Sequence, residues 1–213
     1  MLDVKILIDA KEYFKEITKN IEPTDLYDSD GYITWNSVSN VFFNENTYHE
    51  FEIHHGITKC VIVPDYKTYV FKFNKSGFDY DYCDAEAEVN KNAKIEGYDQ
   101  YLADMVFLLK FGDIDIYVQE RTFKFEDGYT PYYENSDRSD EHYNLLESIS
   151  SDYCSSECIP LDWAADFSAY YSDAEFADLC QFLDNYNVND LHEANIGYIG
   201  NRPVIFDYSG WFG

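Results

Sequence analysis

A succession of short strand-like runs between residues 50 and 118 constrains the fold of this chain more than any other feature. The runs are alternating or apolar, and they cover residues 50–54, 60–63, 69–73, 105–109 and 114–118. Runs of this kind, separated by turn signals such as Pro64 and Gly112, are typical of antiparallel strands joined by tight connections. We therefore expect an antiparallel sheet in this part of the chain.

One helix is expected within this sheet region and another before it. Asp84 is a candidate N-cap for a helix over residues 84–95, and Gly97 is its stop signal. Residues 4–20 carry apolar side chains at helical spacing and predict an amphipathic helix. The pattern of residues 35–43 fits a helix or a strand. Together with the sheet, these segments predict an α+β fold.

The second half of the chain predicts more helix and a late hairpin. Residues 122–156 are acidic and polar, which indicates a mobile loop with a short helix near residues 142–149. Residues 173–186 place apolar side chains at helical spacing and predict a longer helix. Residues 196–206 predict two short strands joined by a Gly200-Asn201 turn.

The late hairpin brings together side chains that suit a hard cation. Asn195 lies at its start and Asp207 at its exit, so we expect their side chains to be neighbours at one edge. Mg²⁺ takes few protein ligands and completes its shell with water and phosphate oxygens. Asp190, five residues before Asn195, would orient an attacking hydroxyl. In so acidic a chain the same pattern also fits a solvated turn.

The formal net charge of −26 restricts the partners of this protein. Direct binding to a nucleic-acid backbone demands Lys and Arg, so we expect none. To bind an anionic ligand such as ATP, the protein requires local cations or a metal that make the electrostatic potential at the site positive. The charge favours a basic protein partner or mimicry of nucleic acid, and it also fits solubility alone.

The sequence indicates a cytoplasmic protein without a membrane segment. No apolar run approaches the length that spans a bilayer. The N-terminus lacks a basic region followed by a small-residue cleavage site, which is the pattern of an exported protein.

Taken in order along the chain, several of these residues resemble a protein kinase-like fold. The segment from Gly56 to Val61 resembles the end of the glycine-rich loop, with Val61 as the apolar residue that covers adenine. Lys72 lies in a run that resembles the strand carrying the phosphate-binding lysine. The resemblance implies that Glu86 on the following helix is its partner, with Glu88 as the alternative. From periodicity alone, Lys72 fits the solvent side of an alternating strand equally well.

The second half continues the resemblance. Residues 117–121, which include Glu120, resemble the hinge that meets the adenine edge through backbone groups. Asp190-Leu-His-Glu-Ala-Asn195 has the spacing of the catalytic loop, and Asp207 lies in a Phe-Asp-Tyr-Ser-Gly segment that resembles the metal-binding segment. The resemblance implies that Asp190 is the catalytic base and that Asn195 and Asp207 hold Mg²⁺.

The resemblance runs from about residue 50 to residue 210 and implies a domain organisation. Residues 50–120 would form an antiparallel N-lobe with one main helix, and residues 121–213 a reduced, mostly helical C-lobe. Residues 1–49 would be a partly helical N-terminal extension.

Three features depart from the kinase pattern. Lys59 stands where the loop has its last glycine, and Val188-Asn189 replaces the usual His-Arg or His-Gly before the catalytic aspartate. The third departure is that only three residues follow Gly210. We therefore expect no activation segment and no helices that carry a peptide substrate.

Three functions follow as hypotheses. The first is a kinase-like enzyme that binds Mg-ATP and transfers phosphate to a protein or small molecule. The second is a catalytically inactive, pseudokinase-like protein whose acidic surface binds a basic partner. The third is an acidic DNA mimic that inhibits a DNA-binding protein.

Overall fold

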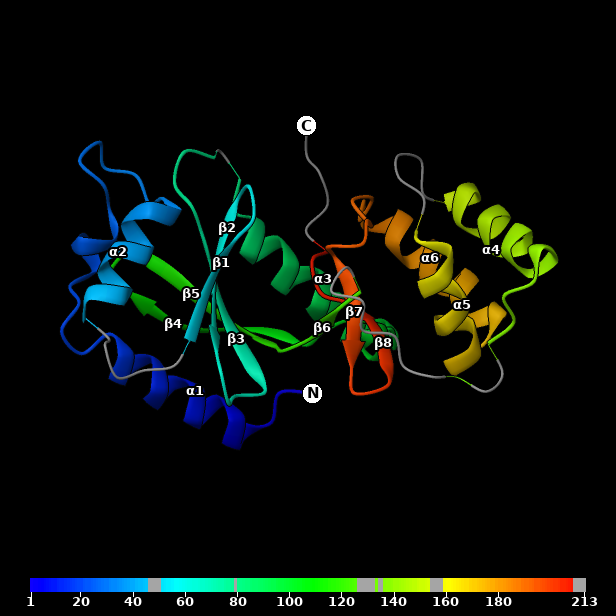
Figure 1. Ribbon diagram of the computed structural model, residues 1–213, viewed down its shortest axis with the longest axis horizontal. Helices are drawn as coiled ribbons and strands as arrows, with labels where there is room; N and C mark the ends of the chain where they lie inside the picture. Colours follow the sequence, from blue (N-terminus) through cyan, green and yellow to red (C-terminus); the bar gives the residue numbers. More distant parts are fainter. Residues whose placement is uncertain (46–50, 79, 126–132, 134–135, 154–158, 209–213) are drawn as a thin grey trace. The chain divides into compact units, whose positions relative to one another are not determined.

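The computed structural model describes residues 1–45, 51–78, 80–125, 133, 136–153 and 159–208 (Figure 1). The fold is α+β, with six α-helices and an antiparallel sheet in these residues. The chain forms two compact units. The first comprises Met1–Glu88 and Asp104–Arg121, and the second comprises Val89–Ala103 and Thr122–Gly213.

The first unit is built on a five-stranded sheet with the order β1-β2-β3-β5-β4, and every neighbouring pair is antiparallel. Its strands are β1 (Phe51–His55), β2 (Lys59–Pro64), β3 (Tyr69–Asn74), β4 (Met105–Phe111) and β5 (Ile114–Glu120). Its helical segments are α1 (Val4–Ile17), a 3-10 turn (Pro23–Leu26), α2 (Trp35–Glu45) and the start of α3 (Tyr82–Glu96). The expected sheet is confirmed, and residues 35–43 prove to be helical.

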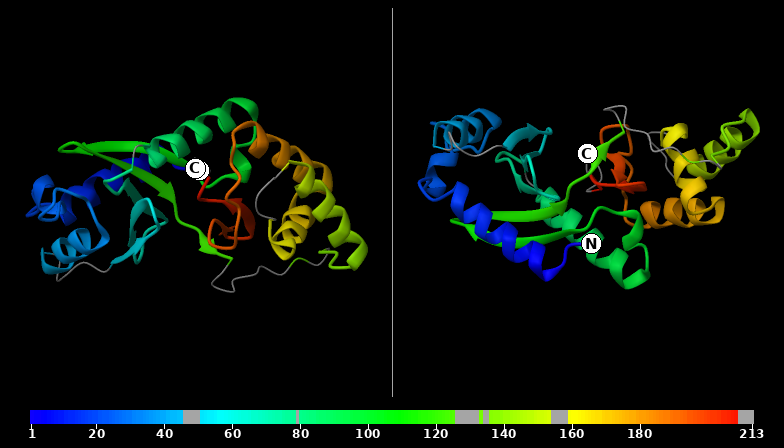
Figure 2. Two further views of the ribbon diagram at one scale, coloured as in Figure 1. Left: turned by 90° about the horizontal axis from the view of Figure 1, so that it is seen from above. Right: turned by 60° about the horizontal axis from the view of Figure 1, so that its bottom comes forward.

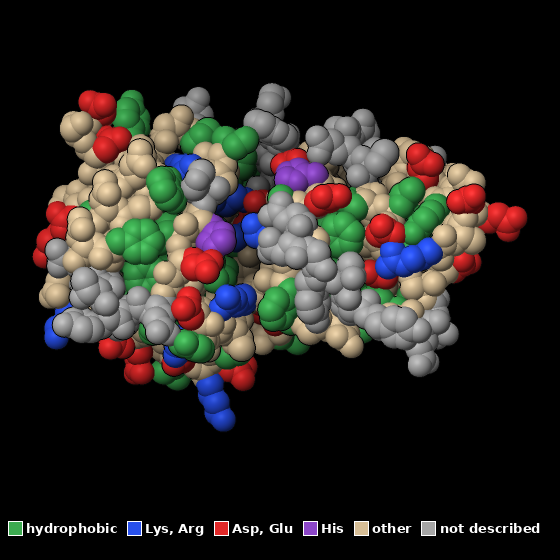
Figure 3. Space-filling model, viewed as in Figure 1, with side chains coloured by type: hydrophobic (Ala, Val, Ile, Leu, Met, Phe, Trp, Pro, Cys, Tyr) green, Lys and Arg blue, Asp and Glu red, His purple; other side chains and the backbone are tan. Residues whose placement is uncertain are grey.

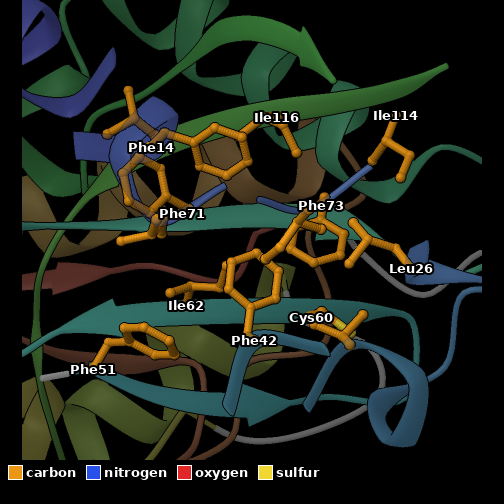
Figure 4. Close-up of a cluster of buried hydrophobic side chains, with 14 of the residues drawn as sticks. Phe14, Leu26, Phe42, Phe51, Cys60, Ile62, Phe71, Phe73, Ile114 and Ile116 are labelled. Carbon is orange, nitrogen blue, oxygen red and sulfur yellow. The ribbon is translucent and has the colours of Figure 1, made fainter. Parts of the chain in front are cut away.

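Helices α1 and α2 supply side chains to the core on one face of this sheet. Phe14 of α1 packs edge-on against Phe71 of β3, with ring centroids 5.1 Å apart. Phe42 of α2 meets Phe51 of β1 in the same way, at 5.9 Å. Figure 4 shows these rings with Ile62 and their neighbours in one cluster. The expected extension over residues 1–49 therefore includes two helices that share a core with the sheet.

Helix α1 forms where the sequence predicts it. Asp3 caps the helix by accepting from the N–H groups of Lys5 and Ile6, which would otherwise lack intrahelical partners. In the right view of Figure 2, α1 (blue) runs alongside the green strands β4 and β5. The hairpin between those strands turns at Gly112, whose φ of +60° favours glycine.

Helix α3 begins earlier than the sequence suggested. Asp84 is not its N-cap, because the helix already starts at Tyr82. The side chain of Asp81, just before that start, accepts from the N–H of Asp84 at 2.8 Å and takes the capping role. The helix ends before Gly97, whose φ is +86°, as predicted.

The second unit combines helices with a small sheet in the order β6-β7-β8. Its elements are the end of α3, a 3-10 turn (Asp99–Tyr101), β6 (Phe123–Lys124), α4 (Asp140–Tyr153), α5 (Leu161–Tyr170), α6 (Asp173–Asn185), β7 (Ile196–Ile199) and β8 (Arg202–Ile205). The predicted helix near 173–186 and the predicted hairpin are confirmed. Helix α4 is longer than the predicted segment 142–149.

Helix α5 was not predicted, and it supports the hairpin. Trp163 donates from its indole N–H to the carbonyl of Gly197 at 3.2 Å, and Tyr198 donates to the buried carboxylate of Asp166 at 2.8 Å. Gly197 itself lies so close to the Phe123 carbonyl that no Cβ would fit between β6 and β7. These contacts fix strand β7, which directly follows Asn195.

In the part of the chain that the structure describes, no helix combines the length and the apolar character needed to cross a bilayer.

Candidate functional site

Lys72 points away from the aromatic core, and it is not solvated. Alternation along β3 places Phe71 and Phe73 in the core and Lys72 on the opposite face of the sheet. Lys72 is nevertheless only 4% exposed, and its ammonium group donates to Glu86 Oε2 at 3.1 Å. A lysine buried this deeply is unusual unless its charge is paired. The solvent-side alternative therefore does not hold in this structure.

Glu86 is the partner that helix α3 supplies, and it holds two lysines. Its side chain is fully buried, and its second oxygen, Oε1, accepts from Lys59 Nζ at 2.6 Å. Glu88, the alternative partner, is exposed. We call Lys59, Lys72 and Glu86 the lysine–glutamate cluster.

Sequence reasoning overlooked the role of Lys59, which it treated only as a departure from the glycine-rich loop. The signal was present in the strand alternation. Cys60 and Ile62 of β2 point into the core, so Lys59 and Val61 point to the face that carries Lys72. Val61 pairs directly with Lys72 across the two strands.

The turn between β1 and β2 contains Gly56, the glycine assigned to the loop. Gly56 is exposed, and its N–H donates to the carbonyl of Lys59 at 3.1 Å. Its φ is not in the left-handed region, and a Cβ there would meet open space. The backbone conformation therefore does not demand glycine at this position.

Glu120 ends β5 at the position assigned to the hinge. Its backbone N–H donates to the carbonyl of Asp104 at 2.9 Å, and its side chain accepts from the N–H of Asp104 and from the N-terminal amine.

Asp190 and Asn195 are linked by a hydrogen bond in the second unit. The side-chain amide of Asn195 donates from Nδ2 to the backbone carbonyl of Asp190 at 2.7 Å. Because the acceptor is a carbonyl, the amide orientation is fixed, and Oδ1 is the atom that remains to act as a metal ligand. Asn195 is 7% exposed, whereas the Asp190 side chain is 35% exposed.

The backbone of Asp207 lies beside that of Asn195. The N–H groups of Phe206 and Asp207 both donate to the carbonyl of Asn195, at 3.0 and 3.3 Å. The next residue, Tyr208, is fully buried and donates to the carbonyl of Ala103 at 2.7 Å. Ser209 and Gly210 of the predicted metal-binding segment lie outside the described residues.

Asn195 and Asp207 carry the types of oxygen ligand that Mg²⁺ takes from a protein. One amide oxygen and one carboxylate leave several coordination positions for water and phosphate oxygens. A group of three or more His, Cys, Asp or Glu side chains arranged to hold a metal is not found among the described residues.

The site residues fall into two sets. The lysine–glutamate cluster lies in the first unit and supplies cations, whereas Asp190, Asn195 and Asp207 lie in the second and supply oxygen ligands. No protein-family model matches this chain, and no curated protein is similar enough in sequence to be identified as a relative.

Proposed function

We propose that this protein is kinase-like and binds a magnesium nucleotide. The lysine–glutamate cluster would bind phosphate oxygens, and Asn195 and Asp207 would hold Mg²⁺. The observation that carries the proposal is the buried ion pair between Lys72 on β3 and Glu86 on α3. Phosphoryl transfer relies on such a pair to place a cation on the phosphates.

Two further observations support the proposal. Among the strands and α-helices of residues 51–120, three strands are followed by one helix and two more strands, which is the order that the kinase resemblance implies. The bond from Asn195 to the Asp190 carbonyl ties the expected metal ligand to the expected base. The kinase-like N-lobe and reduced C-lobe are part of this proposal.

In the transfer step, an acceptor hydroxyl oxygen would form a bond to the γ-phosphorus of ATP. The bond from that phosphorus to the bridging oxygen would break, ADP would leave, and Asp190 would accept the hydroxyl proton. Lys72 would hold phosphate oxygens while Glu86 orients its ammonium group. Bound Mg²⁺ would neutralise charge on the phosphates.

The acidic surface favours a second candidate function, the binding of a basic partner without transfer. Figure 3 shows Asp and Glu side chains spread over one face of the molecule, in line with the net charge of −26. Such a complex would form at low salt and dissociate at high salt. A partner whose affinity does not change with salt would contradict this candidate.

Thermal unfolding with ATP, with and without Mg²⁺, tests the nucleotide proposal. A ligand at about 100 times its dissociation constant should stabilise the folded protein by roughly 2.7 kcal/mol. We expect a Mg²⁺-dependent rise in the midpoint that disappears in Asp207→Ala and persists in the control Asp184→Ala, which removes an exposed carboxylate of the same unit. The absence of any rise in the parent protein would refute the proposal.

A further inference from the structure

A hollow of about 380 Å³ lies between helix α1 and the end of strand β4, two elements that are in contact within the first unit. Its volume falls within the range of about 300–1,000 Å³ that small-molecule sites occupy. Strand β4 is the last strand in the sheet order, so the hollow lies at the edge of the sheet. The described residues that line it include none that were assigned above to phosphate or metal binding.

Two lysines of α1 give this hollow its charge. Lys11 and Lys15 both line it and are one helical turn apart, so their side chains leave the same face of the helix about 5–6 Å from each other. Both side chains are exposed, and neither makes an ion pair with a residue that the structure describes. Glu12 and Glu16 follow these lysines in the sequence but do not line the hollow. Neighbouring like charges destabilise a helix, and an anion bound between them would remove that repulsion.

The other polar side chains at the hollow already have partners. The ammonium group of Lys110 on β4 bonds the carboxylate of Asp115 at 2.9 Å. The hydroxyl of Thr18 donates to the carbonyl of Phe14 at 2.7 Å. The positive charge that is left for a ligand therefore comes from Lys11 and Lys15.

The rest of the lining is apolar. Phe14 belongs to the core between α1 and the sheet, and Leu109 and Phe111 of β4 are partly buried against that core. The methylene stems of the two helix lysines add apolar surface beneath their ammonium groups. A ligand in the hollow would thus meet hydrocarbon on its buried side and two positive charges on its exposed side.

We propose that this hollow binds a small organic monoanion, an aliphatic carboxylate whose charged group lies between the ammonium groups of Lys11 and Lys15 and whose hydrocarbon chain covers Leu109 and Phe111. The net charge of −26 favours a small ligand, because a nucleic acid, an anionic membrane or an acidic protein would be repelled by the whole surface. At physiological ionic strength the Debye length is about 8 Å, so a bound monoanion responds mainly to the two lysines beside it. The inference does not depend on the proposed nucleotide function.

Titration of isotope-labelled protein with octanoate, acetate and octanol, followed by NMR, tests the site. Octanoate should shift the amide signals of α1 and β4 and bind at least about ten-fold more tightly than acetate, which lacks the chain, or octanol, which lacks the charge. In the double variant Lys11→Gln/Lys15→Gln, the affinity for octanoate should fall at least about ten-fold. The matched control Lys5→Gln/Lys19→Gln makes the same change in net charge at two exposed lysines outside the hollow and should bind octanoate as the parent does.

Several results would overturn the inference. If millimolar octanoate leaves the signals of α1 and β4 unchanged, the hollow is not a carboxylate site. Equal affinities for octanoate and octanol would show an apolar hollow in which the lysines have no role, and equal affinities for octanoate and acetate would show an adventitious ion only. An equal loss of octanoate binding in the two double variants would show that octanoate responds to the net charge of the protein and not to Lys11 and Lys15.

Discussion

Replacing Glu86 by Gln should destabilise the first unit strongly. The change keeps the shape of the side chain but removes the negative charge that Lys59 and Lys72 both contact. A carboxamide offers one acceptor oxygen and turns an NH₂ donor toward the other ammonium group. Removing one partner of a buried ion pair costs about 3–5 kcal/mol, because the remaining charge stays buried.

Urea unfolding that is followed in the first unit alone measures this loss. Amide hydrogen exchange of β3, recorded as urea increases, reports on that unit separately. With a slope of roughly 1–3 kcal/mol per molar urea, the predicted loss lowers the midpoint by at least about 1 M. Glu88→Gln is the matched control, because Glu88 lies on the same helix and is exposed. It should change the free energy of unfolding by less than about 0.5 kcal/mol.

A combined variant tests the origin of the loss. Glu86→Leu together with Lys59→Met and Lys72→Met removes all three charges and replaces them with apolar side chains of similar length. It should recover at least half of the stability lost in Glu86→Gln, because replacing buried ion-paired side chains together by apolar ones is often neutral or stabilising. If Glu86→Gln is no less stable than Glu88→Gln, the reasoning about the lysine–glutamate cluster is wrong.

Three further predictions concern other parts of the chain. Asn90→Leu should raise the free energy of unfolding by about 1–3 kcal/mol, because the buried Asn90 amide makes no hydrogen bond within the described residues. The melting temperature should rise with it, and a lower melting temperature would contradict this prediction. Gly112→Ala should lower the free energy of unfolding, measured with urea, by about 2–4 kcal/mol, because a Cβ at its φ of +60° would lie 2.6 Å from the ring of Pro23. An unchanged midpoint of urea unfolding would contradict this prediction. His142→Gln should lower the free energy of unfolding by roughly 0.5–1 kcal/mol between pH 4 and 6 and by little at pH 8, because His142 bonds Asp173 at 2.9 Å. Urea unfolding at each pH measures this loss. A loss of equal size at every pH would refute the charge effect.

The direction of the pH dependence predicted for His142→Gln follows from the pKa shifts of His142 and Asp173. Burial lowers the pKa of His142, but hydrogen bonds to Asp173 and to the Asp137 carbonyl more than offset this and raise it above 6.5. Its contribution is complete below pH 6.5 and is lost as the pH rises through the raised value. Hydrogen bonds from Ser168 and His142 hold the pKa of Asp173 below 3.8, so its contribution is complete above that pH and is lost under more acidic conditions. Both residues therefore contribute to the stability of the folded protein at pH values between 3.8 and 6.5.

The sequence predicts the sheet and most helices of this protein because their periodicity is clear. The strands β2 and β3 alternate around core residues such as Ile62 and Phe71, and α6 repeats apolar residues at helical spacing. Helix α5 has no such pattern, because five consecutive residues from Trp163 to Phe167 are buried. A helix that is buried on all sides shows no amphipathic period.

The candidate site is predictable only where one segment determines it. The contact of Asn195 with the Asp207 backbone follows from a single hairpin and its register. The contact of Lys59 with Glu86 joins residues that are far apart in the chain and depends on how α3 packs on the sheet. Local patterns do not contain that information. They also placed the start of α3 at Asp84, because Asp81 is an equally good capping residue and no local signal separates the two.

Titration calorimetry of the parent protein with ATP, with and without Mg²⁺, tests the central claim most directly. The account predicts binding in the presence of Mg²⁺, much weaker binding without it, and a loss of about ten-fold or more in Lys72→Met, whose ammonium group bonds Glu86. A protein that binds no ATP at millimolar concentrations with Mg²⁺, or that binds it equally well in Lys72→Met, would contradict the account.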